Sequence, residues 1–581
     1  MTVVSSARLW SWLLAGALAL VAALTPSLAG AFRSPDNPDA GTVLTRAELM
    51  SPMSPSGPVD DGAFAMPGDA GPPLHQFQGT LELHDEATTG GYRAIVGFGD
   101  AASEHLPALS VQFVQSGTWL IPTRQGLQIT GNAAWNIIVG PGRVWQEPGD
   151  MGLTRATFPF TLVERNQNCT HDGVMAFLFD DHQVSRVRYQ VTQETCLYRK
   201  FDMWGQLPAT YRPEIIADVD ELRARMASEL ASRIPTRPIE SLARDYPAAG
   251  IDVRAFGSGV TPADMTAYGV YFRGVDYIAG CATRYGSYAY CDEMRLPSYS
   301  TAKSTFASLA AMRLGQFFGA GRVQSLKIAD LVPEHQLGDR WDDVTLRDAL
   351  DMATGHYVSA ADGVDESSPP EEEFLLAEPY SVKIEIAFSG FPYREPPGRR
   401  WVYQSHNTFI ATRAMTNFIG QDLFAFMRRS VYEPAGLSQG FMETLRTDNS
   451  PDGQPMGHNG LFYNRDDVAK LIRFITDDHG RAGGRQLLDP SMLDAALQRT
   501  SDHGLPTGTG FFYNDGFWAK HFTPAEFPQY KCSFWVPFMS GFGGITIAIL
   551  PNGATYWYFS DNDEFSWYDA VYEAAKLAPV C

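Results

Sequence analysis

The chain has 581 residues, of which 44% are hydrophobic. This length exceeds one compact core and the apolar content suits burial, so we expect two or more globular domains rather than a disordered or fibrous protein. The formal net charge of −21 would repel nucleic acids and anionic membrane surfaces. Neither is therefore an expected partner.

Residues 1–31 have the pattern of a signal peptide. Arg8 precedes an apolar run from Trp10 to Leu24, and small residues between Ala29 and Ala31 offer a cleavage site. An uncleaved membrane anchor is the alternative, but the apolar run is short for a bilayer span. No later stretch is long and apolar enough to span a membrane. We expect a periplasmic or secreted protein.

The next two segments differ in composition. Residues 32–72 are rich in Pro, Gly, Asp and Ser without apolar periodicity, which predicts a disordered leader. Residues 73–210 contain short β-type runs punctuated by Gly, Asn and Asp, which predict an antiparallel β-sandwich or barrel. We therefore expect an all-β, sandwich-like accessory domain without a catalytic signature. The runs are 108–114, 135–139, 156–163 and 184–191.

The rest of the chain mixes helices and strands. Apolar residues at helical spacing in 211–238, ended by a Pro-rich break, predict a helical connector. Residues 239–581 predict an α+β domain that ends in strands 544–550 and 556–559 and a helix over 567–577. The acidic segment 361–373 is expected to be a solvated insertion.

The six cysteines fall into neighbouring pairs. An exported protein is expected to form disulfide bonds, and six cysteines allow fifteen connectivities. Proximity in the sequence predicts that each cysteine pairs with its neighbour. The pairs are Cys169 with Cys196, Cys281 with Cys291, and Cys532 with Cys581.

Ser300 and Lys303 form the most informative motif. If a helix begins near Ser300, Lys303 lies one turn further on and its side chain reaches the serine hydroxyl. A serine hydroxyl needs a neighbouring base to become nucleophilic, and a desolvated lysine is such a base. Every other lysine lacks a serine three residues before it.

This segment resembles the S-x-x-K helix of the serine β-lactamase and penicillin-binding superfamily. Further segments resemble the family's motifs in the same order, over most of residues 255–575, and the N-terminal β region has no counterpart. They are 344–355 (VTLRDALDMATG), 397–408 (PGRRWVYQSHNT), 432–437 (YEPAGL) and 460–467 (GLFYNRDD). The resemblance implies a β-lactamase-like domain, with an antiparallel sheet flanked by helices.

Tyr403 and Ser405 occupy the family's Y-x-N or Y-x-S motif. The resemblance makes Tyr403 a base or proton relay, a role that it fits if Lys303 depresses its pKa from the usual value of about 10. Ser405, expected at the substrate, stands where β-lactamases have asparagine, which disfavours β-lactam hydrolysis.

The family's third signature, K-T-G or H-T-G, corresponds to Met539, Ser540 and Gly541, expected to bind substrate. Met539 replaces the cation. By analogy, the backbone N–H groups of Ser300 and Phe542 would form the oxyanion hole. Gly-Phe-Gly-Gly followed by a strand is most similar to esterase and 6-aminohexanoate-dimer hydrolase members.

Other chemistry has little support. No cofactor is implied, and the twelve histidines show no metal-binding spacing. A G-x-S-x-G elbow is absent from the sequence, which disfavours an α/β-hydrolase.

The sequence thus predicts an exported serine hydrolase that cleaves a small ester or amide through an acyl-enzyme on Ser300. The alternatives are a D-alanyl peptidase or β-lactamase, and a catalytically silent sensor or binding protein that kept the fold.

Overall fold

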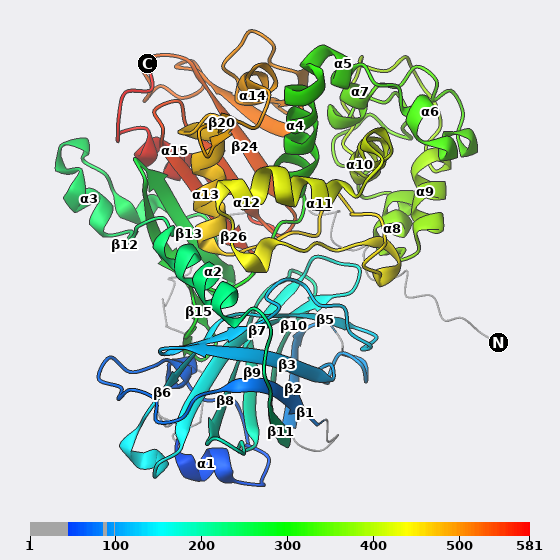
Figure 1. Cartoon of the computed structure of the whole chain (residues 1–581). Helices are drawn as coiled ribbons and strands as arrows, with labels where there is room; N and C mark the ends of the chain where they lie inside the picture. The colour runs from blue at the N-terminus through cyan, green and yellow to red at the C-terminus, as the bar shows by residue number, and fades with distance from the viewer. Residues whose placement is uncertain (1–43, 85–89, 98) are drawn as a thin grey trace, which may run out of the picture. The chain divides into compact units, whose positions relative to one another are not determined.

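The computed structural model describes residues 44–84, 90–97 and 99–581 (Figure 1). The predicted signal peptide and residues 32–43 of the leader lie outside these ranges. The described residues belong to one compact unit, Gly41–Cys581. Among them, no helix has both the length and the apolar character needed to cross a bilayer.

Residues 44–72 are ordered, which corrects the prediction of a disordered leader for this part. They form helix α1 (Arg46–Met50) and a short 3₁₀ helix, Asp61–Phe64. Leu49 and Phe64 are fully buried in a core cluster with residues far along the chain. Local composition suggested disorder because the partners of these few apolar side chains are remote in sequence.

The N-terminal β region forms one continuous sheet of eleven strands, all paired antiparallel. The order is β11-β1-β3-β4-β6-β7-β8-β9-β10-β2, with β5 also paired to β7. The prediction of an all-β, antiparallel region is confirmed, and its strands belong to a single hydrogen-bonded sheet. The strands are β1 (Gln78–Leu83), β2 (Gly90–Val96), β3 (Leu109–Ser116), β4 (Trp119–Pro122), β5 (Trp135–Val139), β6 (Gly142–Trp145), β7 (Thr154–Glu164), β8 (Thr170–Phe179), β9 (Val187–Thr195), β10 (Lys200–Leu207) and β11 (Ala209–Pro213).

Strand β8 is buried on both faces, as its alternating side chains show. Met175 and Phe177 point into the core of the eleven-stranded sheet. The intervening Val174 and Ala176 pack instead in the cluster that holds the helices of the C-terminal region. Successive strand residues face opposite sides, so this sheet lies between its own core and the C-terminal region.

A second sheet of nine strands organises the C-terminal region. Its order is β12-β14-β13-β26-β25-β24-β23-β22-β21, and only β12 and β14 pair in parallel. The strands are β12 (Thr236–Pro238), β13 (Met265–Phe272), β14 (Val275–Gly280), β21 (Leu505–Pro506), β22 (Phe511–Asn514), β23 (Phe517–Phe522), β24 (Phe534–Gly541), β25 (Ile545–Ile549) and β26 (Thr555–Ser560). Three two-stranded ladders are β15 (Ala282–Thr283) with β16 (Gly286–Ser287), β17 (Leu296–Pro297) with β18 (Phe462–Tyr463), and β19 (Arg481–Ala482) with β20 (Arg485–Gln486).

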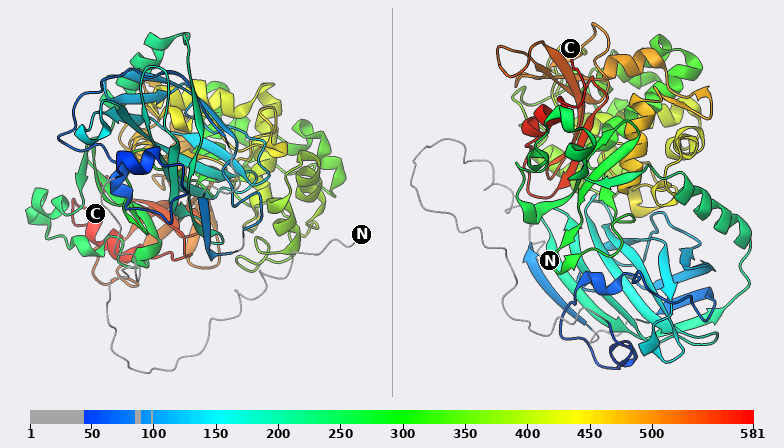
Figure 2. Two further views of the ribbon diagram at one scale, coloured as in Figure 1. Left: turned by 90° about the horizontal axis from the view of Figure 1, so that it is seen from below. Right: turned by 90° about the vertical axis from the view of Figure 1, so that its left-hand side faces the viewer.

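Helices cover both faces of the nine-stranded sheet (Figure 2). On one face Ile547 and Trp557 pack with residues of α4, α10 and α13, and on the other Ala548 and Tyr556 pack with α3 and α15. The fold is α+β, as predicted. The helices are α2 (Val219–Ala231), α3 (Ser241–Asp245), α4 (Leu309–Phe318), α5 (Ala320–Gln324), α6 (Ile328–Leu331), α7 (Leu346–Leu350), α8 (Pro369–Leu376), α9 (Tyr380–Ser389), α10 (Ser405–Ile419), α11 (Leu423–Met427), α12 (Glu433–Ala435), α13 (Arg465–Thr476), α14 (Pro490–Ala496) and α15 (Tyr568–Ala574).

The structure contains three disulfide bonds among the described residues. They are Cys169–Cys196, Cys281–Cys291 and Cys532–Cys581, the same pairs that the sequence predicts.

Candidate active site

Ser300 lies between a short strand and a helical segment. β17 ends at Pro297, Tyr299 has a positive φ of 41°, and helical structure starts at Thr301. Ser300 is partly exposed while its neighbours on both sides are buried. Solvent therefore reaches Ser300, whereas the nearby Ser298 and Ser304 are buried.

Lys303 contacts two serine hydroxyls from a buried position. It is 1% exposed, and its Nζ atom donates hydrogen bonds to Ser300 Oγ at 2.8 Å and to Ser405 Oγ at 2.9 Å. Lys303 opens a π-helical segment, Lys303–Ser308, which continues into α4. Such segments are frequent at functional sites.

The predicted core stripe of this helix is present. Phe306, Leu309, Ala310 and Leu314 are all fully or almost fully buried. The apolar stripe therefore anchors the helix and fixes the end that carries Ser300 and Lys303.

Tyr403 lies beside Lys303, with the Nζ atom 4.8 Å from the centre of its ring. The condition of a lowered pKa is not met, because the pKa of Tyr403 is raised from 10. Burial raises it more than the charge of Lys303 and the hydrogen bonds from Lys303 and Ser300 lower it. The resting phenol is therefore protonated, and it suits proton donation or relay better than a standing phenolate.

Tyr403 also belongs to an aromatic wall. Its ring lies 5.5 Å from that of Trp518 and 6.2 Å from that of Tyr513, and Trp401 packs against the same two side chains. The wall keeps water away from one side of Lys303, which strengthens electrostatic interactions there.

Glu366 completes a chain of hydrogen bonds that the sequence did not reveal. Ser405 donates from its backbone N–H to Glu366 Oε2 at 2.8 Å and from Oγ to Oε1 at 2.5 Å. Ser405 is 2% exposed, so it connects Lys303 to Glu366 rather than facing open solvent. Desolvation, followed by repulsion from Glu371, raises the pKa of Glu366 to about 7.

The segment 361–373 is thus not the solvated insertion that was expected. Residues 361–364 are exposed, but Asp365 and Glu371 are 1% and 0% exposed. Asp365 accepts hydrogen bonds from the backbone of Val358 and Ser359, and Glu371 accepts them from His406. These acids are buried because the N-terminal end of α10 and nearby loops supply donors, which no local pattern in the sequence indicates.

The third predicted segment lies against the nucleophile turn. A Cβ atom added at Gly541 would meet the carbonyl oxygen of Ser298 at 3.0 Å and Tyr299 Cβ at 3.3 Å. The ring of Phe542 lies 5.5 Å from that of Tyr299. The end of β24 therefore passes close to Ser300, as the predicted oxyanion hole requires.

Two residues of this segment differ in exposure. Met539 is 1% exposed and belongs to the apolar cluster of Phe306, whereas Ser540 is partly exposed. Of these two predicted substrate contacts, Ser540 is the more accessible, and the uncharged side chain of Met539 is buried in the apolar cluster.

No family model matches the chain, and no curated protein sequence matches it significantly. Solved structures similar to it include a putative 6-aminohexanoate-dimer hydrolase from Bacillus anthracis, with 14% identity over 59% of this chain and 80% of that one, at a TM-score of 0.41. A penicillin-binding protein homologue from Caulobacter crescentus shows 16% identity over 58% and 96%, also at 0.41. A D-stereospecific amidohydrolase from Streptomyces shows 15% over 57% and 98%, at 0.39.

The contacts of Ser300, Lys303, Tyr403, Ser405 and Glu366 determine the chemistry that this site can perform.

Replacing Glu366 with Gln should alter stability in a pH-dependent way. Because burial raises the pKa of Glu366 from 4.5 to about 7, its stabilising contribution is complete below the unfolded value and is lost as pH rises through about 7. The glutamine side chain does not titrate, so the variant does not lose this contribution to stability as the pH rises. The unfolding free energy of Glu366→Gln relative to wild type should therefore increase between about pH 5 and about pH 8, measured by urea denaturation.

Glu373 provides the matched control, since it is exposed in the same segment. Glu373→Gln controls for the loss of one carboxylate from this segment. A difference between Glu366→Gln and wild type that does not change between about pH 5 and about pH 8 would contradict the raised pKa of Glu366.

Proposed function

We propose that the chain is an exported serine hydrolase of the β-lactamase and penicillin-binding type, which cleaves an ester or amide through an acyl-enzyme on Ser300. The observation that carries this proposal is the 2.8 Å hydrogen bond between buried Lys303 Nζ and partly exposed Ser300 Oγ. A hydroxyl that solvent reaches, held by a desolvated amine, is the arrangement that an activated serine nucleophile needs.

In the proposed reaction, Ser300 Oγ attacks the substrate carbonyl carbon while its proton passes to Lys303. The backbone N–H groups of Ser300 and Phe542 stabilise the oxyanion, and Tyr403 relays a proton to the leaving group. Water then attacks the ester on Ser300, and the same groups return the proton to Oγ. The steps are acyl transfers with no net change in oxidation state.

Ser405 and Glu366 extend the proton path away from the substrate. Lys303 donates to Ser405, which donates to Glu366. With a pKa near 7, Glu366 exchanges a proton near neutral pH. Transfer of a proton from Lys303 through Ser405 to Glu366 would leave Lys303 as the neutral amine that a base requires.

Export is the second part of the proposal. Residues 1–31 have the charge and apolar pattern of a signal peptide, and three disulfide bonds suit an oxidising compartment. A periplasmic or secreted location is consistent with both.

Ser300→Ala should abolish hydrolysis while the fold is preserved, because the change removes one oxygen from a partly exposed turn. A serine-directed phosphonate should label wild type once, on the peptide containing Ser300, and should leave Ser300→Ala unlabelled. Thermal denaturation controls for folding. Labelling of another serine in wild type, or turnover by folded Ser300→Ala, would contradict the proposal.

We also expect a preference for uncharged esters or amides over penicillins and peptide C-termini. Penicillins and peptide C-termini carry a carboxylate, which in the related peptidases and β-lactamases faces the cation of the K-T-G or H-T-G motif. This chain has Met539 at that position, and burying a carboxylate without a counter-charge is costly. The kcat/KM for a neutral acyl ester should exceed that for a penicillin by at least about 100-fold, a difference of about 3 kcal/mol. A penicillin rate equal to the ester rate in wild type would contradict this expectation.

A further inference from the structure

Asn168, in the loop between β7 and β8, contacts the backbone that leads to the proposed nucleophile. Its side chain is 0% exposed. The Oδ1 atom accepts hydrogen bonds from Tyr299 N at 2.7 Å, Ser298 Oγ at 2.9 Å and Gly460 N at 2.9 Å. The Nδ2 atom donates to the carbonyl oxygen of Leu461 at 3.3 Å. One side chain of the β region therefore joins both segments that flank Ser300.

The nucleophile turn needs such a contact because its backbone conformation is unfavourable. Tyr299, directly before Ser300, has a φ of 41°, which a bulky residue rarely adopts. Strained conformations persist where surrounding contacts hold them. The hydrogen bond from Tyr299 N to Asn168 fixes the peptide that sets the direction of Ser300.

A second group from the β region packs on the side chain of Tyr299. The Tyr299 hydroxyl lies 3.1 Å from Cys169 Sγ, in the disulfide that connects the β7–β8 loop to Cys196. The ring of Tyr198 lies 6.4 Å from that of Phe542, which in turn packs on Tyr299. Phe542 carries a proposed oxyanion donor, so the β region contacts the residue before the nucleophile and a neighbour of that residue.

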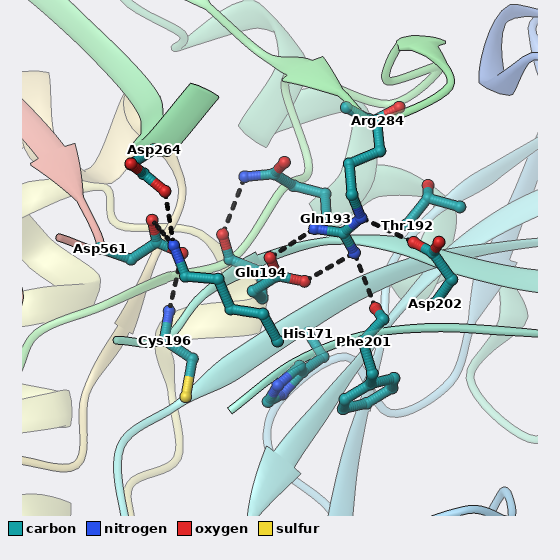
Figure 3. Close-up of polar contacts among 12 residues, drawn as sticks. His171, Thr192, Gln193, Glu194, Cys196, Phe201, Asp202, Asp264, Arg284 and Asp561 are labelled. Carbon is teal, nitrogen blue, oxygen red and sulfur yellow. Dashed lines mark hydrogen bonds and ion pairs between the residues drawn. The ribbon is translucent and has the colours of Figure 1, made fainter. Parts of the chain in front are cut away.

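Ion pairs, one buried and one partly buried, link the same part of the β region to residues that precede β13 and follow β26 (Figure 3). Lys200 Nζ donates to Asp264 at 2.6 Å and to Asp561 at 2.7 Å, and Cys196 N donates to Asp561 at 3.4 Å. The chain just after Asp561 donates two backbone hydrogen bonds to the carbonyl oxygen of Gly543, next to Phe542. Removing one partner from such a pair is costly, so the attachment is firm.

We infer that the N-terminal β region is a positioning element of the active site, and that Asn168 is its key positioning residue, acting through Tyr299 to orient Ser300. The inference rests on the proposed function in so far as Ser300 is the nucleophile. It assigns a role to the N-terminal β region, which is not covered by the family resemblance of residues 255–575.

Three variants of two asparagines test this inference. Asn168→Leu keeps the size and removes every polar contact, whereas Asn168→Asp keeps the acceptor for Tyr299, Ser298 and Gly460. Asn136→Leu is the matched control, because Asn136 is also 0% exposed and hydrogen bonds across to Asn449 at 2.7 Å, away from Ser300. Each variant is measured for melting temperature, rate of phosphonate labelling and hydrogen exchange of the peptide spanning residues 296–303.

Asn168→Leu should slow labelling by about 30-fold or more, since small displacements of a reacting group have large kinetic effects. Asn168→Asp should slow labelling less than Asn168→Leu, because it retains the acceptor for Tyr299 although it loses the donor to Leu461. Asn136→Leu should lower the melting temperature without slowing labelling. Hydrogen exchange at 296–303 should increase in Asn168→Leu alone.

Wild-type labelling rates in folded Asn168→Leu, with unchanged exchange at 296–303, would overturn the inference. Equal slowing in Asn136→Leu would also overturn it, since the effect would then be general destabilisation. If Asn168→Leu does not fold, Asn168→Ala takes its place in the same comparison. Absence of labelling in wild type would instead refute the proposed function, and hydrogen exchange would still decide whether Asn168 holds the turn.

Discussion

The site depends on a buried lysine amine held between two serine hydroxyls. Lys303 is 1% exposed, and its Nζ atom lies within hydrogen-bond distance of Ser300 and Ser405. A charged amine in such a place must be paired, and a neutral one must still satisfy its hydrogen bonds. The carboxyl group of Glu366 is connected to Lys303 through the hydroxyl of Ser405. It can therefore stabilise Lys303 in either protonation state.

The backbone around Lys303 is built to keep this amine in place. The π-helical segment begins at Lys303, and Ser308 Oγ donates to the Lys303 carbonyl oxygen at 2.9 Å. Gly516, at the β22–β23 turn, approaches so closely that an added Cβ would lie 3.0 Å from that carbonyl oxygen and 2.1 Å from Ser308 Oγ. A side chain at position 516 would displace the segment that carries Lys303.

The sequence predicted the parts of the site that depend on local spacing. Ser300 and Lys303 are three residues apart on one helical segment, and the apolar stripe that anchors it is periodic, so both follow from the sequence. The position of Tyr403 beside Lys303 came from the order of motifs. Glu366 and Asn168 could not be predicted in this way, because folding brings them to the site from a loop and from a separate sheet.

Two differences between sequence and structure share one physical cause. The pKa of Tyr403 rises although the nearby charge of Lys303 lowers it, and the segment 44–72, expected to be disordered, places Leu44, Leu49, Ala63 and Phe64 in a core cluster. In each case burial by remote parts of the chain outweighs the local signal. The composition of a segment and the charge of a neighbouring residue do not indicate how deeply a side chain is buried in the folded protein.

The most direct test of this account is the acylation rate of Lys303→Met, which removes the amine and nearly preserves the volume of the side chain. Single-turnover kinetics with a neutral ester should show acylation slowed by at least about 100-fold in a protein that melts cooperatively. Acylation within a few-fold of wild type would show that Ser300 is activated by another group, and would contradict the account.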